Sequence, residues 1–208
     1  MDQAQITGLV LSGGEGRRMG GAEKGLVLHH GRPLARHAAE RLAPQVGSVM
    51  ISANRRLDDY AAWGFPVRPD TLSNSVGPLA GLLSGLVHCS TPWLVSVPCD
   101  VPGFPTDLVA RLSAAIGPTQ ADAVIAGTPD STLQVPHGCA ATGLPRSHPV
   151  FCLVRTALKD KLADYLASGE RRFSGWLRSV NTEIVVFDDA AAFSNANTLA
   201  ELLSLQAR

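Results

Sequence analysis

The chain has 208 residues, of which 45% are hydrophobic and 17% charged, enough to build a full hydrophobic core without structural disulfides or metals. Its 18 basic side chains are balanced by 18 acidic ones, which excludes the strong basic field of nonspecific nucleic-acid binders and the acidic excess of disordered tails. No apolar stretch reaches the roughly 20 residues that a membrane-spanning helix needs, and the acidic start of the chain is unlike a signal peptide, so we expect no nucleic-acid or membrane partner.

Short apolar runs of strand length alternate along the chain with amphipathic segments of helical period. The predicted strands are 6–12, 48–53, 93–97, 123–126, 149–154 and 183–187. Most of these runs are continuously apolar, which predicts strands covered on both faces. The predicted helices are centred on 34–42, on 79–86, on 108–112 behind the N-cap Thr106, and on a last segment opened by the capping-box pair Thr198 and Glu201. This order predicts an α/β fold, a three-layer sandwich with a mostly parallel, Rossmann-like central sheet.

One segment, 127–147, interrupts this alternation. It is rich in Gly, Pro, Ser and Thr and has no clear period, which predicts a long loop. Both a lid over a site and a tolerated insertion agree with this composition.

The first predicted strand runs directly into a glycine-rich loop that begins Leu11-Ser12-Gly13-Gly14. Glycines after a strand expose backbone N–H groups that a phosphate can approach, and Arg17, Arg18 and Lys24 add positive charge. Two common phosphate loops are excluded by spacing, because Met19 replaces the third glycine of a dinucleotide fingerprint and the G-K-[ST] of a Walker A loop is absent. The sequence therefore indicates an anion-binding loop of a different class.

Asp100 follows the predicted strand 93–97 and is held in the sequence Pro98-Cys99-Asp100-Val101-Pro102. Open α/β sheets bind ligands at the carboxyl ends of their strands, and a carboxylate there can present oxygen atoms to Mg²⁺. A helix-capping role is less suitable, because the next predicted helix begins near Thr106, six residues away. We therefore expect Asp100 to be a magnesium ligand.

Polar groups also follow the predicted strand 48–53. Ser52 and Asn54 are suited to hydrogen bonds with a ribose or a base edge, and Asp70 either contacts the nucleoside or orders a loop. The segment Gly77-Pro78-Leu79-Ala80-Gly81 begins a helix with little side-chain bulk, which would let a base lie against the backbone.

The blocks L-S-G-G, R-M-G and Lys24 resemble the signature of nucleotidyltransferases that use a nucleoside triphosphate and release pyrophosphate, with serine in place of the usual alanine at position 12. Together with S-A-N-R, Asp70, G-P-L-A-G, P-C-D and the later blocks H-P, G-E-R-R and N-x-N-T, they make the chain similar to the molybdenum cofactor guanylyltransferases from about Ile6 to Leu203. Ser52 departs from that family's asparagine, so Asn54 is expected to share its contact.

This resemblance implies a single nucleotidyltransferase domain over 1–208 that transfers GMP from GTP to molybdopterin and releases pyrophosphate. Residues 1–110 would bind the nucleotide and Mg²⁺, and residues 120–208 would complete the molybdopterin site. The implied catalytic residues are Lys24, Arg18 and Asp100, with Asp100 also holding Mg²⁺. The implied nucleotide contacts are Leu11, Ser12, Gly13, Lys24, Ser52, Asp70 and Asp100, and the residues around them add Gly14, Asn54 and Gly81 as expected contacts.

Four residues are candidates for holding the phosphate of molybdopterin: His148, Arg171, Arg172 and Asn197. Guanidinium groups match phosphate oxygens in two-pronged geometry, although the arginine pair also fits a solvated helix end with a C-terminal cap. The expected protein partners are other molybdenum cofactor biosynthesis proteins and the molybdoenzymes that accept the product.

Three other functions stay open: a cytidylyltransferase of the same pathway, a sugar-phosphate nucleotidyltransferase, and a catalytically silent module that binds the cofactor. The cysteines form no C-x-x-C pair and fit reduced thiols, which favours the cytoplasm. A zinc site can be written from His137, Cys139, His148 and Cys152, but the H-x-C and H-x-x-x-C spacings are unlike those of zinc knuckles.

Overall fold

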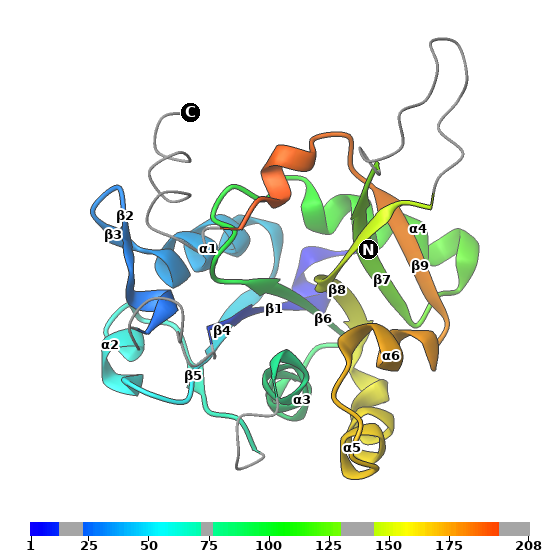
Figure 1. The fold of residues 1–208 in the computed structure, drawn as a ribbon, viewed down its shortest axis with the longest axis horizontal. Coiled ribbons are helices and arrows are strands. Elements are labelled where there is room, and N and C mark those ends of the chain that lie inside the picture. The colour runs from blue at the N-terminus through cyan, green and yellow to red at the C-terminus, as the bar shows by residue number, and fades with distance from the viewer. Residues whose placement is uncertain (13–22, 72–76, 130–143, 196–208) are drawn as a thin grey trace.

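The computed structural model describes residues 1–12, 23–71, 77–129 and 144–195. Seven strands form one sheet in the order β5-β4-β1-β6-β8-β7-β9 (Figure 1). The strands of this sheet are β1 Ile6–Leu11, β4 Ser48–Ser52, β5 Val67–Arg68, β6 Trp93–Pro98, β7 Ala123–Thr128, β8 Arg146–Arg155 and β9 Thr182–Val186. Neighbouring strands are parallel except around β8, which runs antiparallel to both β6 and β7. The predicted α/β fold, its mostly parallel sheet and all six predicted strands are confirmed.

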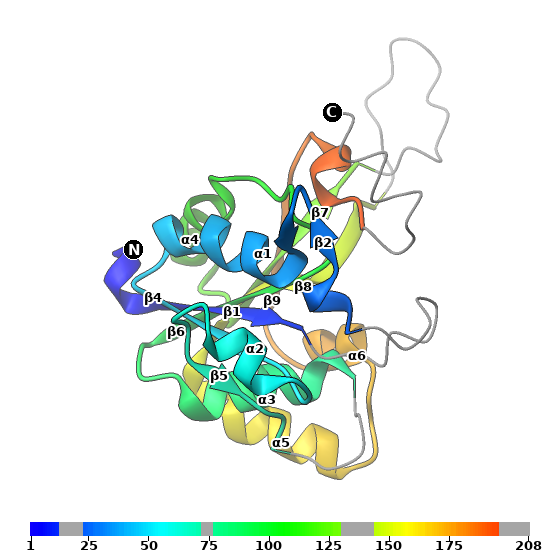
Figure 2. The same ribbon diagram turned by 90° about the vertical axis from the view of Figure 1, so that its left-hand side faces the viewer.

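Helices cover both faces of this sheet, which gives the three layers seen in Figure 2. The described α-helices are α1 Leu34–Leu42, α2 Leu57–Ala61, α3 Pro78–His88, α4 Leu108–Thr119, α5 Lys159–Ala167 and α6 Phe173–Arg178. Residues of α1 and α4 pack in one hydrophobic core, and residues of α3, α5 and α6 pack in a second core on the opposite face. Strands β1 and β7 are buried at every residue, as their continuous apolar sequences predict. Within the described ranges, every helix is too short or too polar to cross a bilayer.

The start of α4 corrects one prediction. Thr106 is not the N-cap; Asp107 holds that position, and its side chain makes no capping hydrogen bond. The capping oxygen comes instead from Gln45, in the 3-10 helix Ala43–Gln45, whose Oε1 accepts a hydrogen bond from the Val109 N–H at 3.1 Å. A cap from a residue 64 positions away has no local sequence signature. The predicted last helix at Thr198 lies outside the described residues.

The predicted loop over 127–147 is wrong at both ends. Strand β7 continues to Thr128, and β8 begins at Arg146, directly opposite it in the ladder. Polar residues can extend a strand wherever a neighbouring strand offers backbone hydrogen bonds. Residues 130–143 between these strands are not described.

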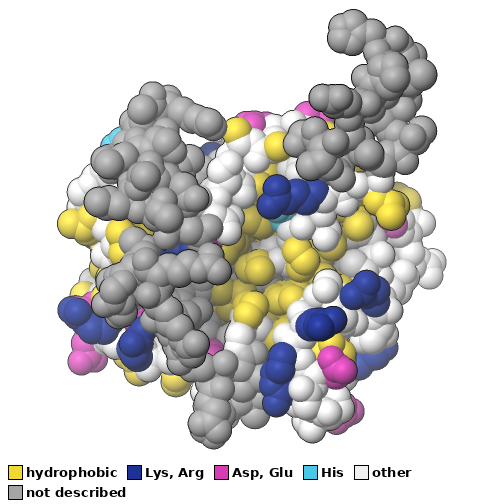
Figure 3. Space-filling view, in the orientation of Figure 1, with side chains coloured by type: hydrophobic (Ala, Val, Ile, Leu, Met, Phe, Trp, Pro, Cys, Tyr) yellow, Lys and Arg dark blue, Asp and Glu magenta, His cyan; other side chains and the backbone are white. Residues whose placement is uncertain are grey.

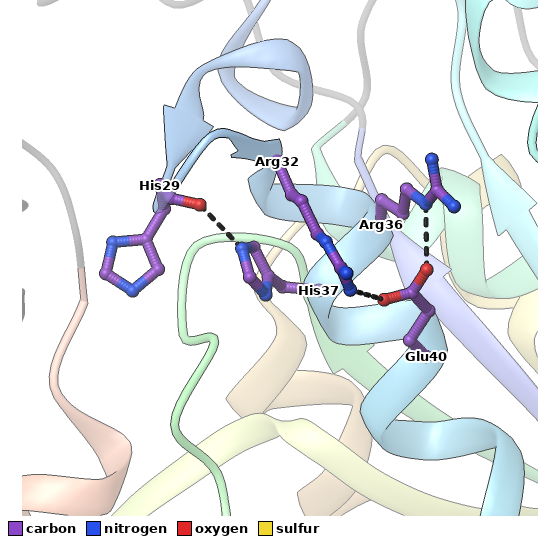
Figure 4. A network of polar contacts seen from close by, with 5 residues as sticks. All are labelled: His29, Arg32, Arg36, His37 and Glu40. Carbon is purple, nitrogen blue, oxygen red and sulfur yellow. Dashed lines mark hydrogen bonds and ion pairs between the residues drawn. The ribbon is translucent and has the colours of Figure 1, made fainter.

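A small hairpin, β2 Leu28–His29 and β3 Arg32–Pro33, is anchored to α1. The His37 ring nitrogen Nε2 lies 2.6 Å from the His29 carbonyl oxygen. Glu40 accepts hydrogen bonds from Arg32 at 3.1 Å and from Arg36 at 2.8 Å (Figure 4). The hydrogen bond from Arg36 lowers the pKa of Glu40, so this carboxylate stays charged near neutral pH. These contacts hold the hairpin against the first helix.

Candidate active site

The carboxyl ends of β1, β4 and β6 meet where the strand order of the sheet reverses. In the ladders, Leu11 of β1 lies opposite Ser52 of β4 on one side and opposite Pro98 of β6 on the other. The chain reaches β4 by way of α1, which packs on one face, and reaches β6 by way of α3, which packs on the other. In open α/β sheets, ligands bind in the crevice outside the strands at such a switch point. The residues that follow these three strands are therefore the candidate site.

Asp100, which follows β6, forms an ion pair with Lys24. The distance from Lys24 Nζ to Asp100 Oδ2 is 2.5 Å, and the two side chains are 22% and 14% exposed. The Cys99 N–H donates to the Leu11 carbonyl oxygen at 3.1 Å, which fixes the turn carrying Asp100 to the end of β1. Opposite charges this close, and partly shielded from water, attract each other more strongly than on an open surface. The structure thus brings together two predicted catalytic residues that are 76 positions apart in the sequence.

Ser52, Asn54 and Asp70 form a second polar cluster, at the ends of β4 and β5. Asp70 Oδ1 accepts a hydrogen bond from Ser52 Oγ at 3.2 Å, and Asp70 Oδ2 accepts one from Asn54 Nδ2 at 2.8 Å. The Asp70 N–H donates in return to Asn54 Oδ1 at 2.8 Å. Asp70 therefore orders the loop after β5, which was one of its two predicted roles. Its contact with a nucleoside stays a prediction, as do those of Ser52 and Asn54.

Gly81 joins this cluster from α3. A Cβ added to Gly81 would lie 2.6 Å from Leu11 Cδ2 and 2.7 Å from Ser52 Oγ. Both distances are far below a normal contact, so a larger residue at position 81 would force the Leu11 or Ser52 side chain to move. The sequence suggested that small residues here leave room for a base, and the structure adds that the space at Gly81 is already used for packing.

A buried hydrogen-bonded chain runs beside the Lys24 pair, and the sequence motifs did not predict it. Ser12 Oγ donates to the Tyr60 hydroxyl at 2.8 Å, and that hydroxyl donates to Glu23 Oε1 at 3.4 Å. Arg55 lies 3.0 Å from the other Glu23 oxygen, Oε2. Tyr60 is fully buried, and burial raises the pKa of its hydroxyl, so the phenol stays protonated and can donate. No sequence pattern connects Tyr60 with Glu23, because the two residues are 37 positions apart and lie on different segments.

Gly25 packs against this chain, and its replacement by alanine is expected to destabilise the fold. An added Cβ would lie 1.9 Å from Ser12 Oγ and 2.5 Å from the Tyr60 hydroxyl oxygen. Overpacking of this kind costs about 1–3 kcal/mol of unfolding free energy. Urea titration should show a lower midpoint with an unchanged slope. Gly103→Ala is the matched control, because an added Cβ there meets no atom within 4 Å; equal midpoints for both variants would contradict the prediction.

His148 lies near the start of β8 and therefore near the carboxyl edge of the parallel strands beside it. Its Nε2 lies 3.0 Å from Thr128 Oγ1, and its ring stacks on Phe193 with the centroids 4.8 Å apart. Burial lowers the pKa of His148, so the imidazole is neutral near pH 7. In that state it can hydrogen-bond a phosphate group but adds no positive charge to that part of the site.

Arg171 and Arg172 differ in their contacts. Arg171 Nη1 donates to the Leu166 carbonyl oxygen at 2.6 Å and to that of Glu170 at 2.7 Å, which caps the end of α5. The alternative of a helix-end cap is thus observed for Arg171. Arg172 is exposed at the residue before α6. Figure 3 shows this face of the molecule hollowed, with hydrophobic side chains on its floor and basic side chains beside it near α6.

The zinc alternative is not supported by the two described members of its set. Cys152 is fully buried in the core under α3, α5 and α6, whereas the Phe193 ring that stacks on His148 belongs to the core on the opposite face. The register of β8 against β7 shifts between the positions opposite Ile125 and Ala126, which separates the two side chains. His137 and Cys139 lie outside the described residues.

Comparisons with known proteins show the family to which the chain belongs. Residues 8–182 match the family described as the MobA-like NTP transferase domain. The chain is 50% identical over 205 residues to the molybdenum cofactor guanylyltransferase of Bordetella petrii, and the match covers 99% of both chains. It is 49% identical over 203 residues to that of Cupriavidus necator, covering 98% of this chain and 97% of the relative. This chain belongs to the MobA-like NTP transferase family.

A solved structure supports the fold of this MobA-like family member. The molybdopterin-guanine dinucleotide biosynthesis protein A of Archaeoglobus fulgidus superposes with a TM-score of 0.71 at 21% identity, covering 97% of each chain. The MobA-like match spans Lys24, Asp100, His148 and Arg172 and ends before Asn197. The predicted site residues Gly13, Gly14, Arg18 and Asn197 lie outside the described residues, so their roles stay predictions.

Proposed function

We propose that this MobA-like protein transfers GMP from GTP to molybdopterin and releases pyrophosphate, forming the guanine dinucleotide form of the molybdenum cofactor. The observation that carries the proposal is the Lys24–Asp100 pair at the switch point of the sheet. Relatives that are about half identical over nearly the whole chain and are named guanylyltransferases support the choice of substrates.

In the proposed reaction, a terminal phosphate oxygen of molybdopterin attacks the α-phosphorus of GTP in line. The new P–O bond joins GMP to the pterin, while the bond from the α-phosphorus to the bridging oxygen breaks and its electron pair leaves with pyrophosphate. A phosphate monoester, with a second pKa of about 6, is mostly ionised at pH 7, so no nucleophile from the protein is needed. The Lys24 ammonium offsets the negative charge that builds up on the transferring phosphate.

Asp100 fits the role of holding Mg²⁺. Within the described part of the chain, no group of three His, Cys, Asp or Glu side chains is arranged to hold a metal ion. Mg²⁺ at nucleotide sites needs no such cage, because it is held by one or two carboxylates together with substrate phosphates. A bound Mg²⁺ would supply positive charge to the phosphates. Asp100, partly exposed at the end of β6, offers one such carboxylate.

The two parts of the chain are proposed to bind different substrates. Residues 1–110 would hold the nucleotide, and residues 120–208, with His148 and Arg172, would hold the pterin phosphate before the product passes to an acceptor molybdoenzyme. We also propose the cytoplasm as the compartment, since the three described cysteines are free thiols. Burial raises the pKa of the Cys99 thiol to about 12, so this cysteine is expected to be unreactive.

Thermal shift and turnover with the four nucleoside triphosphates test the proposal. At a ligand concentration about 100 times Kd, binding stabilises the native state by about 2.7 kcal/mol, which raises Tm by about 5–10 °C for a chain of this length. We expect this shift with GTP and Mg²⁺, and pyrophosphate release only when molybdopterin is added as well.

The other open functions give different results in the same experiment. A larger shift with CTP, and turnover with CTP and molybdopterin, would identify a cytidylyltransferase. Pyrophosphate release only with a sugar phosphate as the acceptor would identify a sugar-phosphate nucleotidyltransferase. A shift with molybdopterin but no turnover with any triphosphate would identify a non-catalytic binding module.

A further inference from the structure

The chain of hydrogen bonds through Tyr60 joins three separate segments at the site. Ser12 follows β1, Tyr60 lies on α2, and Glu23 directly precedes Lys24. The donors run in one direction, from the serine to the phenol and from the phenol to the carboxylate, whose other oxygen forms an ion pair with Arg55. A carboxylate is the natural end of such a chain because it only accepts hydrogen bonds.

Glu23 is the unusual member of this chain. Its side chain is only 7% exposed, although a carboxylate is costly to bury unless it is paired and hydrogen-bonded. Tyr60 and Arg55 provide that pairing from two positions on the α2 side of the site. On the other side of Lys24, the Gly25 backbone packs so closely on Ser12 that an added Cβ would lie 1.9 Å from Ser12 Oγ. The residues on both sides of Lys24 therefore contact the hydrogen-bonded chain through Tyr60.

We propose that Tyr60 is a positioning residue, which acts through Glu23 to hold the 23–26 segment so that Lys24 faces Asp100. A lysine side chain is a flexible stem of four carbons, so its ammonium group is placed accurately only where its backbone is held. Small errors in placing a charged group lower the rate of transfer without a matching loss of substrate affinity. The effect on rate rests on the proposed function, whereas the effect on the position of Lys24 does not.

Lysine labelling measures this position without any substrate. The chain has three lysines, and Lys159 and Lys161 on α5 serve as internal references for Lys24. Trace acetylation with acetic anhydride, read by peptide mass spectrometry, should show Lys24 reacting several-fold faster relative to both references in Tyr60→Phe than in the unmodified protein. The substitution keeps the buried ring and removes only the hydroxyl. Glu23→Gln, which keeps an acceptor but loses the charge, is a second variant.

The control is Thr156→Val, which also removes a hydroxyl. Thr156 Oγ1 donates to the Thr91 carbonyl oxygen at 2.7 Å, beside the amino end of β6 and away from the site. Relative labelling of Lys24 in this variant should be unchanged. In the transfer assay, Tyr60→Phe should lower kcat about tenfold with KM for GTP within about twofold. Because both residues act through the same contact, the double variant with Glu23→Gln should have a kcat no lower than that of the less active single variant.

Unchanged Lys24 labelling in both Tyr60→Phe and Glu23→Gln would overturn the proposal and leave Tyr60 as a core residue whose loss affects only Tm. Faster labelling of Lys24 in a protein that transfers no nucleotide would contradict the proposed function and support the positioning role. Faster labelling together with the loss of kcat would support both.

Discussion

Replacement of Asp100 by asparagine is expected to lower pyrophosphate release by about a thousandfold or more. Asparagine keeps the size of the side chain but removes the charge that lies 2.5 Å from Lys24 and the carboxylate that would hold Mg²⁺. The fold should survive, with a loss of about 1–2 kcal/mol, because both partners of the pair retain contact with water. Pyrophosphate release and urea unfolding, measured on the same preparation, separate the two effects.

Asp107→Asn is a matched control for this experiment. Asp107 lies in the same connection after β6, at the start of α4, where its exposed side chain makes no capping hydrogen bond. Its replacement should leave turnover within about twofold, as for most surface substitutions. Full activity in Asp100→Asn would remove Asp100 from the reaction and with it the assignment of the magnesium ligand.

Replacement of Lys24 by methionine is expected to lower kcat about a hundredfold while KM for GTP changes little. The methionine chain is unbranched and of similar length, so the packing beside Gly25 is kept while the ammonium group is lost. The expected separation of kcat from KM follows from the proposed role, in which the charge acts on the transferring phosphate rather than on ground-state binding. Steady-state kinetics with GTP as the varied substrate measure both constants.

Lys161→Met controls for the loss of a lysine. The Lys161 ammonium group donates to the Ser179 carbonyl oxygen at 2.6 Å on the opposite half of the sheet from Lys24. Its kinetics should match those of the unmodified protein. An increase in KM at constant kcat for Lys24→Met would show instead that Lys24 only binds the nucleotide.

The strands, and the places of Asp100 and Ser52 at the ends of two of them, were predictable because they depend on short stretches of sequence. Continuous apolar runs specify buried strands, and a parallel strand places the polar residues that follow it at one edge of the sheet. Asp100 and Ser52 were found in this way, each from its own strand. Their distances from each other and from Lys24 could be obtained only from the structure, because no single segment of the sequence determines the order of the strands in the sheet.

Contacts between distant segments were not predictable. Gln45 caps α4 in place of Thr106, and Tyr60 meets Glu23 across 37 positions. Tyr60 has the sequence signature of an ordinary core residue on a short helix, and only its hydroxyl has a further role. The two predicted arginines differ for a similar reason. Arg171 donates a hydrogen bond to the Leu166 carbonyl oxygen at the end of α5, a contact that the sequence motif does not specify.

The antiparallel strand β8 has a mechanical consequence for the whole molecule. It pairs with β6 on one side and β7 on the other, so the half of the sheet that carries the Lys24–Asp100 pair and the half that carries His148 share one hydrogen-bonded ladder, with a register shift between the positions opposite Ile125 and Ala126. No hinge can open between two such halves without breaking that ladder. The spacing between the Lys24–Asp100 pair and His148 is therefore set by the strands of the sheet and not by a flexible connection between two separate units.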